Sequence, residues 1–304
     1  MNPINYRKEL TEKIIQALAD GTAPWIKPWG DNKSIFGMPF NAVSERPYHG
    51  GNCLWLQCQP YEDPRWCTYK QAQHQGWQVI KGEKASVVEY WQWYELQKDA
   101  LGNVTNVKLE HPRVFYAQVF NVQQIQNVPP LVKVLGHQWQ PEEAAERILR
   151  HADPKIVHDQ QNRAFYSPSK DEIHLPAREI FPSSMQYYST TLHELGHWTG
   201  HGTRLNRDLA NRFGGQEYAR EELRAELSSF FLSARIGIPH DPSQHASYID
   251  SWIQVLREDS NEIFRAAKDA EQITEYVLQF QQEKHLLEEL DHAGSNQLQE
   301  ELEC

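Results

Sequence analysis

The sequence has few cysteines and no long apolar segment, and both absences restrict the class of protein it encodes. Its 304 residues include four cysteines, at positions 53, 58, 67 and 304, without Cys-x-x-Cys spacing or a disulfide framework. Such cysteines are expected to be free thiols in a reducing compartment. No apolar run approaches the roughly 20 residues that span a bilayer, and the N-terminus predicts a charged amphipathic helix rather than a signal peptide. We therefore expect a cytoplasmic protein.

Positive charge is also scarce, and it is unevenly distributed. The chain carries 30 Lys and Arg residues against 41 Asp and Glu, a formal net charge of −11. Residues 1–128 hold 13 basic and 12 acidic residues. Residues 129–304 hold 17 basic and 29 acidic residues, so they carry all of the net negative charge. This asymmetry and the length predict two domains. The expected boundaries are 1–128 for the first domain, 129–140 for a linker, 141–292 for the second domain and 293–304 for a polar tail.

The most informative motif is His193-Glu194-Leu195-Gly196-His197. On a helix, two histidines four residues apart project from one face and can hold one tetrahedral metal ion, most often Zn²⁺. Glu194 then lies beside the open coordination position, where it can act as general base for a bound water in the hydrolysis of a peptide-like bond. The alternative is a pair of ordinary helix histidines, so a metal site requires a third ligand downstream.

Several positions compete for the third ligand. The extended metzincin pattern fails, because Thr203 occupies the position of its third histidine and no methionine follows the motif. His201 is nearer, but it follows a glycine that ends the helix. Segment 218–232 predicts a second helix, on which Glu222 and Glu226 lie one turn apart. One can bind the metal while the other hydrogen-bonds a ligand imidazole; the alternative is a solvated acidic face.

The second helix fits a known pattern, Glu222-Leu-Arg-Ala225-Glu226. Together with the upstream motif it resembles the gluzincin-type metallopeptidases, whose second helix carries Glu-x-x-Ala-Asp or a close variant. The resemblance implies one divalent ion, with Zn²⁺ first, held by His193, His197 and Glu222. It implies Glu194 as general base and Glu226 as the carboxylate behind a ligand, while Glu221 and Glu226 stay open as substitutes for Glu222. The motif assigns no residue to stabilise the oxyanion.

Upstream of the metal motif, residues 163–176 alternate on both sides of a Ser-Pro-Ser-Lys-Asp turn, which predicts a β-hairpin. An edge strand beside the metal helix would let an extended peptide add as a further strand. We therefore expect an α+β protein whose second domain is zincin-like, with a small antiparallel sheet and two metal helices. Two further helical stretches are expected within 242–290, with a core of Trp252, Val255, Leu256, Ile263, Phe264, Ile273, Tyr276, Val277 and Phe280.

The first 128 residues hold seven of the ten tryptophans, several of them next to positive charge. Interleaved rings and cations suit single-stranded nucleic acid, whose bases stack on aromatic side chains with about 1–3 kcal/mol each. The alternative is that most of these tryptophans build the core of a small domain. We expect a helix at 4–19 and strands at 86–94, 104–109 and 113–122, the first two joined by a turn at 99–103.

Short motifs follow one another in a specific order along this half. They are Trp25-Ile-Lys-Pro28-Trp29, Pro39-Phe-Asn41, Arg46-Pro-Tyr48-His-Gly50-Gly-Asn52, Arg65-Trp66-Cys-Thr68-Tyr69-Lys70-Gln71-Ala72, Lys81-Gly82-Glu83-Lys84 and Val119-Phe120-Asn121. This order resembles the N-terminal domain of the ArdC antirestriction proteins of conjugative plasmids, and the likeness continues to about residue 240. It implies an N-terminal domain that binds single-stranded DNA, with duplex DNA weaker, and a protein that shields incoming plasmid DNA from host restriction.

The residues expected to contact DNA belong to these motifs. They are Trp25, Lys27, Trp29, Asn41, Tyr48, Asn52, Arg65, Trp66, Tyr69, Lys70, Lys81 and Lys84. Two interpretations of function stay open. The first is a DNA-binding protection protein with a metallopeptidase-like domain. The second is a zinc-dependent endopeptidase that acts on a protein of the host restriction machinery and uses the first domain as a targeting or partner-binding module.

Overall fold

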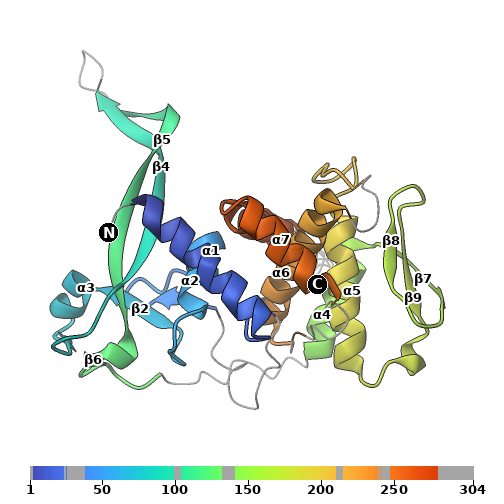
Figure 1. Cartoon of the computed structure of the whole chain (residues 1–304), viewed down its shortest axis with the longest axis horizontal. Coiled ribbons are helices and arrows are strands. Elements are labelled where there is room, and N and C mark those ends of the chain that lie inside the picture. The colour runs from blue at the N-terminus through green and yellow to red at the C-terminus, as the bar shows by residue number, and fades with distance from the viewer. Residues whose placement is uncertain are drawn as a thin grey trace, which may run out of the picture. The chain divides into compact units, whose positions relative to one another are not determined.

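The structure is a computed structural model that describes residues 3–23, 25, 38–98, 104–131, 141–209, 215–238, 240 and 247–279. The chain divides into two compact units (Figure 1). The first comprises Met1–Leu10 and Met38–Val132, and the second comprises Thr11–Gly37 and Lys133–Cys304. Helix α1 (Pro3–Ala19) therefore contributes residues to both units. The mixture of helices and strands confirms the predicted α+β class.

The first unit is built around two small sheets. After α1, its elements are β1 (Phe40–Asn41), α2 (Gly50–Gln57), β2 (Arg65–Thr68), α3 (Tyr69–His74), β3 (Gln78–Val79), β4 (Ser86–Lys98), β5 (Val104–Asn121), the 3-10 turn η1 (Val122–Gln124) and β6 (Ile125–Gln126). The larger sheet has the strand order β1-β2-β5-β4, and β3 pairs with β6. Residues of both sheets and of α3 form a small core of Cys67, Ala72, Val79 and Ile125.

Strands β4 and β5 form a ribbon that is longer than the sequence predicts. Two separate strands at 104–109 and 113–122 are expected, whereas β5 runs unbroken from Val104 to Asn121. The ladder is interrupted by a bulge, because Gln92 pairs with Arg113 but Tyr94 pairs with Lys108. Pro112 lies among the extra residues and has no N–H to donate, which explains the break in register there. The predicted turn at 99–103 lies outside the described residues.

The second unit combines helices with a three-stranded sheet. Its elements are α4 (Pro141–Ala152), β7 (Lys155–Gln160), β8 (Phe165–Ser167), β9 (Glu172–Pro176), the 3-10 turn η2 (Arg178–Ile180), α5 (Ser184–Trp198), α6 (Gln216–Ile236), α7 (Ile249–Glu258) and a helical stretch at 262–279. The predicted hairpin is present as antiparallel β8 and β9. The sheet order is β7-β9-β8 and β7 runs parallel to β9. The sheet is therefore mixed rather than antiparallel throughout, because β9 returns between the two earlier strands.

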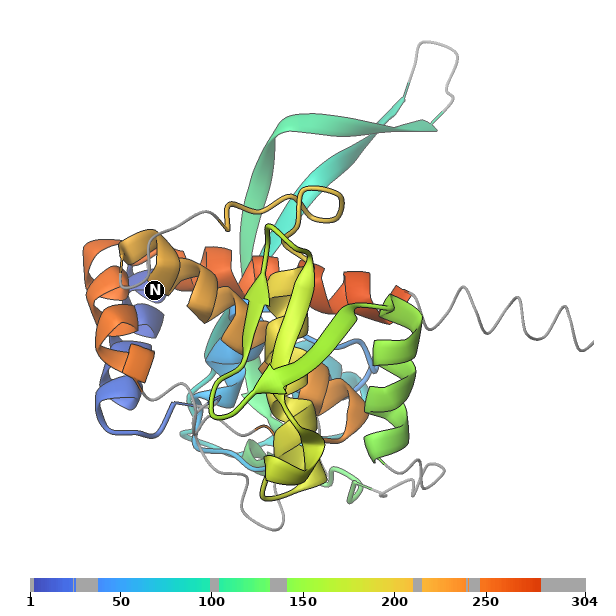
Figure 2. The same cartoon turned by 90° about the vertical axis from the view of Figure 1, so that its right-hand side faces the viewer.

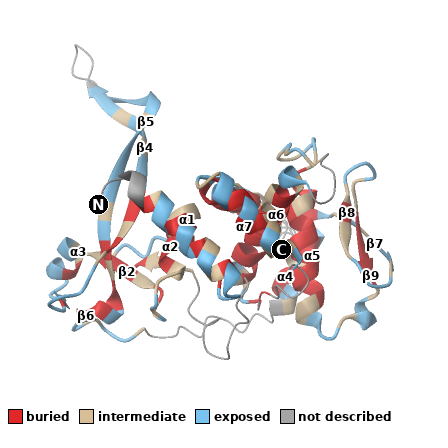
Figure 3. Cartoon of the chain, viewed as in Figure 1, coloured by how far each residue is buried: buried red, intermediate tan, exposed pale blue. Residues whose placement is uncertain are grey.

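Helices α4, α5 and α6 pack together, and the sheet lies along α5 (Figures 1 and 2). Helices α5 and α6 each contain a large group of the buried positions of this unit (Figure 3). The expected core of the last two helical stretches is buried, apart from half-buried Tyr276, and Phe280 lies outside the described residues. None of the helices that the structure describes is long and apolar enough to cross a bilayer.

Arg204 joins the hairpin to the end of α5. Its Nε donates to the carbonyl of Trp198 at 2.7 Å, and its guanidinium lies 3.9 Å from the centroid of the Trp198 ring. The same guanidinium pairs with Asp171 and donates to the hydroxyl of Tyr166 at 3.2 Å. Charge-assisted bonds of this kind are stronger than neutral ones. They hold β8 beside the metal motif.

Candidate functional site

The predicted metal motif lies in the C-terminal half of α5, whose N-terminus is capped by the hydroxyl of Ser183. Gly196 sits where α5 meets α6. A Cβ at this position would lie 2.6 Å from Oγ of Ser228 and 3.3 Å from the Cα of Ala225. Any larger residue would therefore force the helices apart. The glycine allows the close approach that brings the α6 carboxylates to the histidines.

The three predicted ligands converge on one point. Nε2 of His193 lies 3.4 Å from Oε2 of Glu222, and Nε2 of His197 lies 3.6 Å from Oε1 of the same carboxylate. Three candidate ligand atoms, one from each residue, lie within 4.8 Å of one another. Two imidazoles and a carboxylate form a donor set that suits zinc and other divalent transition metals. The residues present fit such an ion, and ligation itself stays a prediction.

The opposite nitrogens of both rings face carboxylates. Nδ1 of His193 lies 3.2 Å from Oε2 of Glu226, and Nδ1 of His197 lies 3.3 Å from Oε1 of Glu221. A carboxylate that accepts Nδ1–H fixes the tautomer and leaves Nε2 available for a metal. Glu226 thus contacts His193, and Glu221, an alternative third ligand in the sequence, contacts His197. The roles of ligand and of carboxylate behind a ligand stay predictions.

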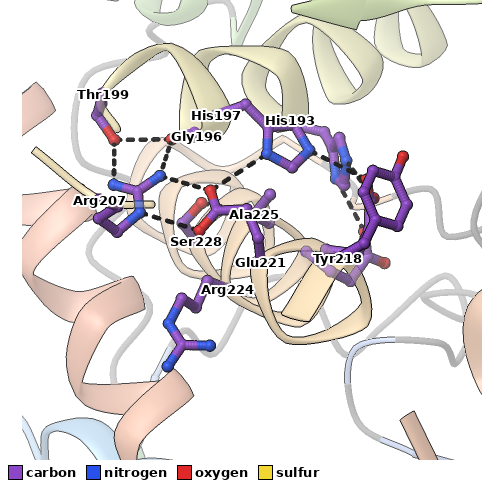
Figure 4. A network of polar contacts seen from close by, with 12 residues as sticks. His193, Gly196, His197, Thr199, Arg207, Tyr218, Glu221, Arg224, Ala225 and Ser228 are labelled. Carbon is purple, nitrogen blue, oxygen red and sulfur yellow. Dashed lines mark hydrogen bonds and ion pairs between the residues drawn. The ribbon is translucent and has the colours of Figure 1, made fainter. Parts of the chain in front are cut away.

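Sequence reasoning missed Arg207, which organises the Glu221 side of the site (Figure 4). Its Nη2 donates to Oε1 of Glu221 at 2.8 Å and to the carbonyl of Gly196 at 2.7 Å. Its Nη1 donates to the hydroxyl of Thr199 at 2.9 Å. The arginine therefore connects the end of α5 to the carboxylate that contacts His197. It comes from an irregular segment after α5, where no periodic pattern could have indicated its role.

His240 was also missed, and it completes the environment of Glu226. Its Nε2 lies 3.0 Å from Oε1 of Glu226, whose other oxygen faces His193. Both side chains are buried. A buried carboxylate requires such partners, because an unpaired charge in the interior is costly. His240 thus contacts the Glu226 oxygen that does not face His193.

The pKa values of the metal-free site follow from these pairs. Burial opposes a charge on His193, but hydrogen bonds to Glu222 and Glu226 outweigh it and raise the pKa of His193 to about 9. Burial likewise opposes the charge on Glu222, and the two histidines lower the pKa of its carboxyl well below the usual value. Without a metal, the site is therefore a set of buried ion pairs.

The metal motif opens onto a cavity of about 500 Å³. Glu194, the predicted general base, lines it together with both histidines and Glu222. One wall is edge strand β8 with the residues before it, and the other comes from α6 and the start of α7. The remaining lining residues are Asn162, Arg163, Ala164, Phe165, Tyr166, Pro168, Leu209, Tyr218, Glu221 and Tyr248. An extended chain along β8 would pass the metal position.

Two tyrosines in this cavity offer phenol groups that the motif could not assign. The hydroxyls of Tyr218 and Tyr248 lie 3.2 Å apart. Burial and the charge of Glu222 raise the pKa of both phenols. Protonated phenols beside a general base can donate to a developing oxyanion. His201, an alternative ligand in the sequence, instead contacts the hydroxyl of Thr203 at 2.9 Å.

Several residues expected to contact DNA have other roles in the structure. Trp25, in the second unit, and Trp66 are buried at 0% and 1% exposure. Their rings are packed in the interior and have no face to offer a base. Lys27 and Trp29 lie outside the described residues.

Four further members of the predicted set brace the backbone of the first unit. Oδ1 of Asn41 accepts from two backbone N–H groups at 3.0 Å, and the buried hydroxyl of Tyr48 lies 3.5 Å from the Asn41 amide. Asn52 exchanges two hydrogen bonds with the backbone of Glu89 on β4. Arg65 pairs with Asp63 and donates to the carbonyl of Pro129. Their geometry supports a structural role.

The other four members of the set are exposed: Tyr69, Lys70, Lys81 and Lys84. Contact with DNA stays a prediction for them. Trp91 and Trp93 are two of the seven tryptophans in the first 128 residues, and neither is among the residues expected to contact DNA. Both are exposed on β4. Four of the five residues from Tyr90 to Tyr94 are aromatic, and this cluster is the sequence signal that could have indicated an aromatic surface here.

Two family models match the chain in succession. The N-terminal domain of anti-restriction factor ArdC matches residues 4–122, and a zincin-like metallopeptidase matches residues 143–269. Two proteins named DNA primase TraC, from Escherichia coli, are 47% identical over 92% of this chain, which spans only 27% and 20% of their lengths. An uncharacterized protein, y4eC of Sinorhizobium fredii, is 33% identical over 90% of this chain and 92% of that protein.

Similar solved structures support the assignment of the chain to a family. Metal-free and Mn(II)-bound structures of the antirestriction ArdC protein from plasmid R388 each match with a TM-score of 0.71 and 32% identity. Each match covers 90% of this chain and 97% of that chain. The cluster of His193, His197 and Glu222 agrees with the metallopeptidase match, because zincin-like domains hold a divalent metal. The chain therefore belongs to the ArdC antirestriction family, with an ArdC-type N-terminal domain followed by a zincin-like metallopeptidase domain.

Proposed function

We propose that the chain is an antirestriction protein that binds single-stranded DNA and protects incoming plasmid DNA from host restriction. Similarity over nearly the whole chain to a protein named for antirestriction supports this role. The relatives named DNA primase carry a similar segment, which supports a DNA partner. On this proposal the protein works in the cytoplasm of the cell that receives the plasmid.

The convergence of two imidazole Nε2 atoms on Glu222 is the observation that carries the metal-dependent part of the proposal. Three protein ligands leave one position of a tetrahedral ion open, as in catalytic zinc sites. We propose Zn²⁺ at this site. The Mn(II)-bound form of the similar structure supports a divalent ion in the family.

Hydrolysis of a peptide-like bond follows from the cavity residues. A Zn²⁺ ion held by His193, His197 and Glu222 would lower the pKa of a bound water and polarise a carbonyl. Glu194 accepts the proton of the attacking water and passes it to the leaving amine. A phenol of Tyr218 or Tyr248 donates to the carbonyl oxygen as negative charge develops there. An extended peptide binds along β8, whose outer edge pairs with no other strand among the described residues.

Plasmid transfer into restricting and non-restricting recipients tests the proposed function. The ratio of the two efficiencies measures protection by the full-length protein. Glu194→Gln keeps the three metal ligands and removes the base, so loss of protection with the metal retained would show that hydrolysis is required. Retained protection would show that DNA binding suffices. If the unmodified protein gives no protection in any restricting recipient, the antirestriction proposal fails.

Binding to DNA is tested separately by fluorescence anisotropy. We expect the full chain to bind a labelled single strand more tightly than the matched duplex, since stacking requires unpaired bases. A protein that prefers duplex, or binds neither, contradicts this part of the proposal. His193→Ala serves as the control, because it removes a proposed metal ligand that belongs to the second unit.

A further inference from the structure

Large hydrophobic side chains gather on one exposed element of the first unit. Thirteen of them are exposed among the described residues, and ten belong to β4 and β5. The ten are Tyr90, Trp91, Trp93, Tyr94, Leu96, Val104, Val107, Val114, Phe115 and Tyr116. Monomeric soluble proteins rarely leave such a group uncovered, and a contiguous patch marks an interaction site. We call residues 90–98 and 104–116 the ribbon.

The ribbon has few neighbours. Strand β2 pairs with β5 only at Val119 to Asn121, so beyond that point β4 and β5 pair with each other alone among the described strands. The outer part of the ribbon is exposed along both strands (Figure 3). A two-stranded ribbon cannot bury a side chain between its own faces. Its aromatic residues are therefore available to a partner.

Rings stand on both faces of the ribbon. Tyr90 and Phe115 are directly paired across the strands and share one face, where they are 45% and 51% exposed. Trp91 follows Tyr90 and so points to the other face. There its indole stacks with that of Trp93 at a centroid distance of 6.4 Å and an interplanar angle of 21°. Trp91 and Trp93 are 44% and 46% exposed.

Contacts from α1 and β4 fix the orientation of Trp91. Its indole N–H donates to Oε1 of Glu89 at 3.2 Å, and Nη2 of Arg7 donates to the same oxygen at 2.8 Å. The Arg7 guanidinium lies 5.4 Å from the Trp91 ring centroid. An aromatic ring held in place loses little entropy when a ligand stacks on it. The exposed indole of Trp91 is thus preorganised for a stacking ligand.

The charge of the ribbon differs from that of the whole chain. Its sequence carries three basic residues, Lys98, Lys108 and Arg113, against two acidic residues, Glu95 and Glu110, whereas the chain has a net charge of −11. The carboxylate of Glu95 pairs with Arg113 at 2.7 Å, and Lys108 is exposed. The ribbon therefore offers flat rings beside an exposed cation, without the negative charge of the rest of the chain. Such a surface complements separate bases joined by phosphates.

We propose that the ribbon is the surface on which single-stranded nucleic acid stacks its bases. This inference rests on the proposed function and replaces the buried tryptophans in the predicted contact set. Rings on both faces suit a strand of separate flat bases, whereas a protein partner or a second copy of the chain would bury one continuous face. A backbone phosphate lies near Lys108.

The test measures the affinity of the full chain for labelled oligothymidylate by anisotropy. Trp91→Ala combined with Trp93→Ala should raise Kd by at least about tenfold, because each stacked base contributes about 1–3 kcal/mol. Ile180→Ala is the control, since Ile180 is a comparably exposed hydrophobic residue that lies off the ribbon. Its Kd should stay unchanged. Thermal unfolding of each variant checks that the fold is intact.

The second variant is Lys108→Gln, which leaves the packed core unchanged because Lys108 is exposed. Lys108→Gln should flatten the slope of log K against log salt by about 0.7, the contribution of one neutralised phosphate on a single strand. The ribbon proposal is overturned if the wild-type chain binds the strand and both the tryptophan variant and Lys108→Gln match it. It is also overturned if Ile180→Ala weakens binding as much as the tryptophan variant does.

Two further outcomes separate the alternatives. If the wild-type chain binds no single strand, the proposed DNA function fails and the ribbon proposal with it. If the tryptophan variant keeps its DNA affinity but changes from dimer to monomer in sedimentation, the ribbon is an interface between copies and the proposal is overturned.

Discussion

The two units depart from the usual distribution of side chains in opposite directions. In the second unit, polar groups lie inside, with His193, Glu222 and Glu226 at most 4% exposed. In the first unit, large rings such as Trp91 and Phe115 lie outside. Buried charges are costly unless paired or bound to metal, and exposed aromatic groups are unusual unless a partner covers them. We propose that each departure marks a binding site, one for a divalent cation and the other for single-stranded nucleic acid.

The largest expected effect is the loss of metal affinity, with DNA affinity unchanged, when a proposed metal ligand is removed. Glu222→Gln keeps the side-chain volume but removes the carboxylate that faces both Nε2 atoms. We expect metal affinity to fall by more than about 100-fold, because even loss of a residue behind a ligand costs about 10–100-fold. Competition with a chromophoric chelator measures this. DNA affinity should not change, and a parallel loss would show that the sites depend on each other.

Arg207→Gln tests the arginine that the sequence did not reveal. Without its guanidinium, Glu221 loses the partner that holds it against His197. Metal affinity should fall by about 10-fold or more. Arg224→Gln is the matched control, since Arg224 on α6 pairs with Asp269 and Glu262 instead. If both variants lose the same metal affinity, Arg207 supports the fold in general and not the metal site in particular.

Gly196→Ala tests the close approach of α5 and α6. The added methyl group meets Oγ of Ser228 at 2.6 Å, and overpacking of this kind costs about 1–3 kcal/mol. Helix propensity returns up to about 1 kcal/mol. The free energy of unfolding and the metal affinity should both fall. Ser228→Ala in the same chain removes the nearest obstacle and should restore most of the loss; no restoration would place the strain elsewhere.

The metal site should also respond to pH, with a smaller effect. The metal-free pKa of His193 is raised from 6.5 to about 9, so its ion pairs stabilise the fold fully below about pH 6.5 and lose this contribution as pH rises through about 9. A metal requires the neutral ring. Thermal stability in chelator should therefore fall over this range while the stabilisation by added Zn²⁺ grows. An increase in metal-free stability would contradict the assigned ion pairs.

Local patterns explain what the sequence could predict. His193 and His197 are four residues apart on one helix, and Glu222 and Glu226 share one turn of the next, so helical spacing alone brought them to a common face. The hairpin at 163–176 followed from alternation around a turn. These signals depend on neighbours in the chain. They do not require knowledge of tertiary packing.

Features that depend on tertiary contacts could not be predicted. Arg207 and His240 reach the site from irregular segments without any period. Trp66 and Trp91 both lie on strands next to polar residues, yet one is buried and the other exposed. Trp66 lies where β2 pairs with β5, whereas Trp91 lies where β4 and β5 pair only with each other among the described strands. Strand β5 was expected as two strands, at 104–109 and 113–122, whereas it runs unbroken with Pro112 in a bulge.

One experiment compares both sites in the same set of proteins. It measures metal affinity and single-strand affinity for the wild-type chain, Glu222→Gln, and Trp91→Ala with Trp93→Ala. The account predicts that the first variant loses metal but keeps DNA, and that the second loses DNA but keeps metal. If either variant loses both ligands while it remains folded, or if the tryptophan variant keeps its DNA affinity, the assignment of one ligand to each unit is contradicted.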